Sequence, residues 1–101
     1  MGVAQSPVHR YLAEWYQSAL VGGPLADLAG RLIDQAAAAQ LQGTEVSVML
    51  TVASPLDEMV FGVFCAETAD AVWRVCRDAG CSPDRVTGDV SAYIVADGAV
   101  V

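Results

Sequence analysis

The sequence predicts one α+β domain, in which two helices cover one face of a four-stranded antiparallel sheet. Two observations lead to this prediction. Apolar strand-like runs and two helical repeats follow each other in the order β-α-β-β-α-β, with glycine and proline at the boundaries. A chain of 101 residues has room for one core. We expect the domain over residues 9–96, with a flexible N-terminal tail at 1–8 and a C-terminal tail at 97–101.

The first strand and the first helix are predicted from composition and periodicity. Residues 9–16, HRYLAEWY, are rich in aromatic and alternating side chains, which is typical of a strand. A Gly-Gly-Pro sequence then introduces a helix predicted over 24–42, and Gly43 is a natural stop. The apolar stripe of this helix recurs at steps of three and four residues: Leu25, Leu28, Ala29, Leu32, Ala36 and Ala39.

The second and third strands form the middle of the chain. Residues 45–53 alternate, with Val46, Val48, Leu50 and Val52 on the face expected to meet the helices and Glu45, Ser47, Met49 and Thr51 on the other. A turn at 54–58 leads to residues 59–66, MVFGVFCA, which are apolar on both faces and therefore suit the centre of a sheet.

The second helix and the fourth strand complete the pattern. Thr68 is a good N-cap, Asp70 complements the helix dipole, and Gly80 ends the helix. The fourth strand is predicted over 85–95, where Val86, Val90 and Ile94 are evenly spaced. This order of elements is that of the split βαβ, or ferredoxin-like, fold.

The sheet face that the helices leave open is predicted to associate. Hydrophobic residues make up 54% of the chain and charged residues only 17%, which is more apolar material than a small core hides. Two copies that stack their open faces would bury this excess and enclose a cavity. We therefore expect a homodimer that forms through the open faces.

Charge and cysteine content exclude several classes of protein. The net charge is −7, with five arginines and no lysine, so neither nucleic acid nor an anionic membrane surface is an expected partner. No signal peptide or spanning segment is visible, and we expect the protein in the cytoplasm. The three cysteines have no CxxC spacing and are expected to be reduced thiols.

Residues 59–90 carry a resemblance to a known family. This stretch, with the turn GCSPDRV at 80–86, and the segment YLAE at 11–14 are similar to small bacterial ferredoxin-like proteins of unknown function that include nickel-binding members. The resemblance implies a dimeric α+β barrel and a site for nickel or another divalent metal. Nickel prefers sites rich in imidazole, and the chain has one histidine, so an apolar cavity is favoured over a metal centre.

Glu14 and His9 are the candidate polar groups of the site. A carboxylate in the middle of a strand, enclosed by a second sheet, is suited to act as a general acid or base, and the alternative is a rim residue in water. His9 is the single histidine of the chain, a residue type suited to acid/base chemistry and metal binding, and the alternative is an ordinary exposed histidine. The same two residues are the candidate metal ligands, completed across a dimer axis.

Apolar and small polar side chains of the strands are expected to line the cavity. The aromatic members could equally be core residues, and this alternative extends to Tyr11, Phe64 and Tyr93. The expected ligand-binding residues are Leu12, Trp15, Tyr16, Ser47, Met49, Thr51, Phe61 and Val63.

Three functions are compatible with these predictions. The leading one is a homodimeric module that binds a small apolar molecule. The second is a cofactor-independent enzyme that acts on a hydrophobic or polyketide-like substrate, with Glu14 or His9 as acid/base. The third is a domain whose open face binds another protein.

Overall fold

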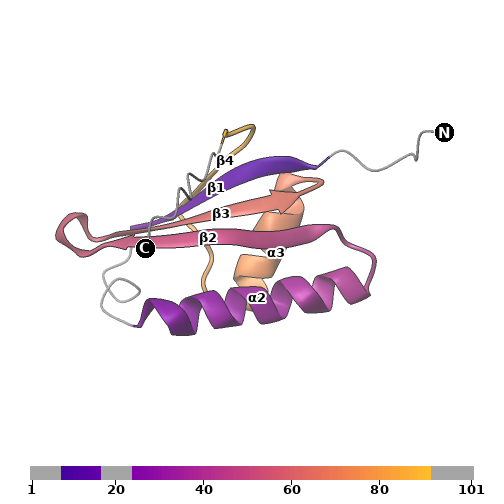
Figure 1. Cartoon of the computed structure of the whole chain (residues 1–101), viewed down its shortest axis with the longest axis horizontal. Coiled ribbons are helices and arrows are strands. Elements are labelled where there is room, and N and C mark those ends of the chain that lie inside the picture. The colour runs from indigo at the N-terminus through magenta and orange to yellow at the C-terminus, as the bar shows by residue number, and fades with distance from the viewer. Residues whose placement is uncertain (1–7, 17–23, 92–101) are drawn as a thin grey trace, which may run out of the picture.

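A computed structural model describes residues 8–16 and 24–91, and its elements follow the predicted order (Figure 1). The predicted tails thus lie outside the described residues, except for Val8. Both helices lie on the same side of one sheet, which leaves the other side without a helix (Figure 1). The fold is therefore ferredoxin-like, as predicted. The elements are β1 (His9–Trp15), α2 (Leu25–Leu41), β2 (Val46–Ser54), the 3-10 turn η1 (Pro55–Asp57), β3 (Met59–Ala66), α3 (Ala69–Asp78) and β4 (Arg85–Thr87).

The sheet is antiparallel throughout and has the strand order β2-β3-β1-β4. β1 and β3 are neighbours although α2 and β2 separate them in the chain, which is the defining feature of a split βαβ unit. β3 lies inside the sheet, as its apolar character on both faces predicted, but only one of these faces is covered by helices. Its residues on the helix side are buried, whereas those on the other side are only partly buried.

The core lies between the sheet and the two helices. Trp15 and Phe64 are its largest fully buried side chains, and the Trp15 Nε1 donates a hydrogen bond of 2.9 Å to the Cys81 carbonyl oxygen. Gly62 leaves room for both rings, because a β-carbon there would lie 3.1 Å from Phe64 Cε1 and 3.2 Å from Trp15 Cζ3.

α2 buries four of the six residues of its predicted stripe, and α3 buries one face as well. α2 buries Leu28, Leu32, Ala36 and Ala39 against the sheet, and it is followed by Gly43 at φ +88°. In α3 the Thr68 side chain accepts a hydrogen bond of 3.2 Å from the Ala71 backbone N–H, which confirms the predicted N-cap. Its buried residues are Ala71, Val72, Val75 and Cys76.

The alternation predicted for the second strand is wrong in its second half, because a β-bulge at Met49 shifts the register. Val46 and Val48 pair with Ala66 and Phe64 on the helix side, as predicted. After the bulge, however, Leu50 pairs with Val63 and Val52 with Phe61, on the open side. An extra residue in one strand reverses the face of every residue that follows it. Leu50 and Val52 therefore leave the core face, and Thr51, paired with Gly62, joins it.

The fourth strand is shorter than predicted. It spans Arg85–Thr87, and Asp89 then adopts the left-handed conformation with φ 55°, which interrupts regular pairing. Gly88 fits under the ring of Tyr11, whose Cε1 would lie 3.3 Å from an added β-carbon. Val90 still donates a backbone hydrogen bond of 3.1 Å to the Arg10 carbonyl. The predicted end of this strand, including Ile94, lies outside the described residues.

Candidate functional site

The uncovered side of the sheet, called the open face below, is built by alternate residues of all four strands. A residue belongs to the open face when its neighbours along the strand are buried on the helix side, because successive side chains alternate between the two faces. A residue that pairs directly with an open-face residue of the next strand lies on the same face. Most of these residues are apolar. The open face consists of Arg10, Leu12, Glu14, Ser47, Met49, Leu50, Val52, Ser54, Met59, Phe61, Val63, Cys65, Arg85 and Thr87.

Glu14 lies on the open face in the middle of β1, as predicted. Its Cα partners across the sheet are Phe61 on one side and Arg85 on the other. The exposed fraction of its side chain is only 13%, so its carboxylate is largely shielded from water within a single chain. Glu14 is therefore more buried than the alternative, a rim residue in water, would be.

Two neighbouring side chains hold the Glu14 carboxylate. The Tyr16 hydroxyl donates a hydrogen bond of 2.8 Å to Oε1. The Arg85 Nε lies 3.9 Å from Oε2, which is an ion pair but too long for a hydrogen bond. The hydrogen bond to Glu14 is the main reason why the pKa of Tyr16 is raised, so Tyr16 stays protonated and acts as a donor at neutral pH.

Backbone contacts fix the place of this cluster at the end of β1. The Asp84 backbone N–H donates a hydrogen bond of 2.8 Å to the Glu14 carbonyl, and the Tyr16 N–H donates one of 2.7 Å to Asp84 Oδ2. Together they tie the GCSPDRV turn to β1 and bring Arg85 beside Glu14. Sequence reasoning missed Arg85 as a site residue, although its place directly before Val86 in a predicted strand was a signal for a sheet-face position.

The expected ligand-binding residues fall into two groups. Leu12, Phe61 and Val63 are partly buried on the open face, Ser47 and Met49 lie on the same face, and the exposed Tyr16 borders it. Trp15 is instead fully buried on the helix side, where Tyr11 and Phe64 also lie, and Thr51 pairs with Gly62 on that side. Placing Trp15 and Thr51 in an open-face cavity was therefore wrong. Tyr93 lies outside the described residues.

His9 and Glu14 do not form a common site within one chain. They are five residues apart on β1, so their side chains leave opposite faces of the sheet, about 17 Å apart along the strand. His9 lies on the same side of the sheet as Tyr11, and the centroids of the two rings are 6.4 Å apart in an edge-on arrangement. The His9 Nδ1 is 3.4 Å from Asp89 Oδ1. Within residues 8–16 and 24–91, no three side chains of His, Cys, Asp or Glu are grouped to hold a metal ion. Within one chain, the two candidate metal ligands His9 and Glu14 are thus not brought together.

The three thiols are free, as predicted. Burial raises the pKa of Cys76 to about 12 and also raises that of Cys81, so neither is a ready thiolate ligand at neutral pH. Cys65 is partly exposed on the open face, and its thiol lies 3.0 Å from the Met49 sulfur.

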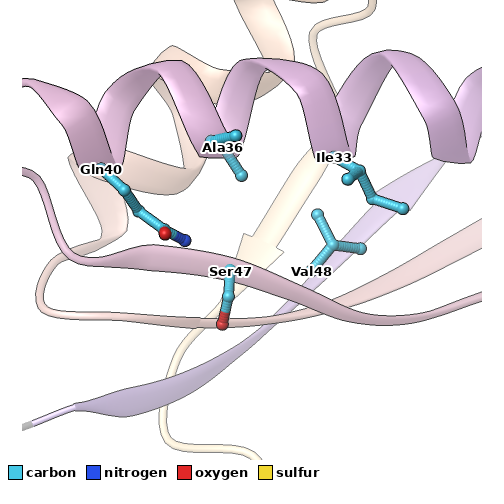
Figure 2. A pocket seen from close by; sticks show the side chains of 6 residues that line it. Ile33, Ala36, Gln40, Ser47 and Val48 are labelled. Atoms are coloured by element: carbon cyan, nitrogen blue, oxygen red, sulfur yellow. The ribbon is translucent and has the colours of Figure 1, made fainter.

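A groove of about 270 Å³ lies at the other edge of the sheet, between α2 and β2 (Figure 2). The Gln40 side chain donates a hydrogen bond to the Val46 carbonyl beside it. Figure 2 shows the Ser47 hydroxyl pointing away from α2, so the groove has no titratable or nucleophilic group directed into it. It is lined by Ile33, Ala36, Ala37, Gln40, Ser47 and Val48.

Comparisons of the chain with protein-family models, with curated proteins and with solved structures find no match. The resemblance of residues 59–90 to a nickel-binding family therefore stays a prediction. Among the described residues, neither helix combines the length and the apolar character needed to cross a membrane.

Proposed function

We propose that the protein is a homodimeric binding module that holds a small, largely apolar molecule against its open face. The observation that carries this proposal is the composition of that face. Five large apolar side chains, with one shielded carboxylate among them, lie on a sheet surface that neither helix covers: Leu12, Leu50, Val52, Phe61 and Val63. A surface of this kind favours association or ligand binding.

A second copy of the chain is the partner that this face suits best. Two sheets stacked about 10 Å apart would bury the apolar residues of both copies and leave a desolvated space between them. A cytoplasmic location is part of the proposal, because three free thiols in a small domain suit a reducing compartment.

Native mass spectrometry of the protein as purified tests the assembly and the ligand together. We expect a dimer, with a small organic molecule retained. The variant Val52→Asp places a charge on the open face at a side chain that is already 45% exposed, so it should fold and give monomers. Ile33→Asp is the matched control, because Ile33 is 53% exposed but lies on α2. A monomeric wild-type protein, or equal effects of the two variants, would contradict the proposed dimer.

The second candidate function is a cofactor-independent enzyme for a hydrophobic or polyketide-like substrate. The hydrogen bond from Tyr16 and the ion pair with Arg85 favour it, because they orient the Glu14 carboxylate as a positioned acid/base group needs. His9 lies on the opposite face, so Glu14 carries this role within one chain. Turnover of the retained molecule that is lost in Glu14→Gln would support the enzyme, and binding without turnover would support the module. The third function, capture of another protein, predicts a copurifying chain instead.

A further inference from the structure

We propose that the molecule bound on the open face is neutral and carries a hydroxyl, which donates a hydrogen bond to Glu14 Oε2. This inference rests on the proposed function and names the class of its ligand. It follows from how the two oxygens of one carboxylate are used.

The two oxygens of Glu14 differ in their partners. Oε1 accepts a hydrogen bond of 2.8 Å from the Tyr16 hydroxyl. Oε2 has the Arg85 Nε at 3.9 Å, about 1 Å beyond the length of a charge-assisted hydrogen bond. A carboxylate oxygen accepts two hydrogen bonds, so Oε2 retains capacity for a donor supplied by a ligand.

The surroundings of Glu14 require that the donor belong to an apolar molecule. Phe61 lies directly opposite Glu14 in the sheet, and Leu12 precedes it by two residues on the same face. A ligand that covers these side chains also removes water from a carboxylate that is already only 13% exposed. If the ligand offered no donor, it would leave a carboxylate oxygen without a hydrogen bond, which costs binding free energy.

The charges beside Glu14 favour a neutral donor. A cationic amine that approached Oε2 would also approach the Arg85 guanidinium on the same side of the carboxylate. An anionic ligand would meet the Glu14 charge directly, on a protein whose net charge is −7. A hydroxyl on a neutral apolar molecule avoids both repulsions and still donates to the oxygen.

Four probes with the same apolar body test this assignment by calorimetry on the intact protein. They are para-butylphenol, butylbenzene, para-butylbenzylamine and para-butylbenzoate. A hydrogen bond to a charged acceptor predicts that the phenol binds about tenfold to a hundredfold more tightly than butylbenzene. We expect the amine and the benzoate to bind more weakly than the phenol.

Two variants assign the preference to Glu14. Glu14→Gln keeps the shape but removes the charged acceptor, so the phenol-to-butylbenzene ratio should fall about tenfold while butylbenzene affinity changes little. Glu45→Gln is the control, because Glu45 is an exposed carboxylate that precedes β2, and it should keep the wild-type ratio.

The outcomes separate the inference from the proposed function. Equal binding of the phenol and butylbenzene to the wild-type protein, which needs no variant, would overturn the inference and leave the binding module intact. An unchanged ratio in a folded Glu14→Gln protein would also overturn it, and so would tighter binding of the amine or the benzoate. If none of the four probes binds, the proposed function itself fails.

Discussion

Gly62 is the position where one added methyl group tests the packing under the sheet. A β-carbon at Gly62 would lie 3.1 Å from Phe64 Cε1, 3.2 Å from Trp15 Cζ3 and 3.3 Å from Trp15 Cη2. Carbon atoms pack without repulsion at about 3.5–4.0 Å, so all three contacts are too close by several tenths of an ångström. Both rings are fully buried, and the indole is held by its hydrogen bond to the Cys81 carbonyl. Gly62→Ala therefore overpacks the core.

The size of the effect is the difference between two terms. Overpacking of one carbon costs about 1–3 kcal/mol, whereas replacing a glycine within a strand returns about 0.5–1 kcal/mol of backbone entropy. We expect Gly62→Ala to lose about 1 kcal/mol of unfolding free energy, which corresponds to a fall of about 4–8 °C in Tm. Thermal and urea unfolding followed by circular dichroism measure both values.

Two further variants make the test of Gly62 specific. Gly30→Ala is the control, because Gly30 lies in α2 with open space around an added β-carbon, and it should stabilise the protein by about 0.5–1 kcal/mol. Trp15→Phe removes the two indole carbons that crowd position 62, so the alanine should cost about 0.5–1 kcal/mol less in that background. A Gly62→Ala protein as stable as the wild type, or a cost that Trp15→Phe leaves unchanged, would refute the close approach of the indole to β3.

Three other predictions concern helix capping, strand β2 and the buried thiols. Thr68→Ala removes the oxygen that accepts from the Ala71 N–H, and we expect urea unfolding to show a loss of about 1 kcal/mol. Val46→Ala, at a side chain that is 1% exposed, should cost about 2 kcal/mol in the same assay, whereas Val52→Ala, at 45% in a single chain, should cost less than about 1 kcal/mol at a protein concentration where the chain is monomeric. Equal losses under that condition would contradict the bulged register. Because burial raises the pKa of Cys76 to about 12, the folded state keeps a proton that the unfolded state releases above about pH 8.5. The unfolding free energy should therefore fall with rising pH, by up to about 1.4 kcal/mol per unit, and Cys76→Ala should reduce this slope.

Local patterns were enough to predict the fold, because each of its elements has its own signal. The apolar stripe of α2, the Thr68 cap of α3 and the two-sided apolar character of β3 are all properties of short segments. With six elements in this order, few ways remain to bury every apolar face, and the ferredoxin-like arrangement is one of them.

Part of the candidate site follows from strand parity alone, because successive side chains of a strand point to opposite faces of the sheet. Trp15 adjoins Glu14, so the two side chains must leave opposite faces of β1. His9 and Glu14 are five positions apart, which is an odd number, so the same rule excludes a shared site in one chain. These misplacements could have been avoided from the sequence.

Other features of the site depend on contacts between distant segments. Arg85 reaches Glu14 because β4 pairs with β1 in one particular register, and the Asp84 contacts with β1 support that register. The residues concerned are about 70 positions apart in the chain. No short sequence pattern encodes such a register, since it results from how α3 and the following turn pack under the sheet.

The bulge at Met49 links the failed part of the prediction to the proposed function. Unbroken alternation would have sent Leu50 and Val52 to the core and Thr51 to the open face, which would then carry a more polar second strand. The shift instead pairs Leu50 with Val63 and Val52 with Phe61, so apolar side chains continue across the open face from β2 to β3. Bulges occur often beside functional sites, where they redirect side chains at the expense of regular pairing. The single irregularity in β2 thus makes the open face more apolar than the sequence predicts, which strengthens the case for a partner or a ligand there.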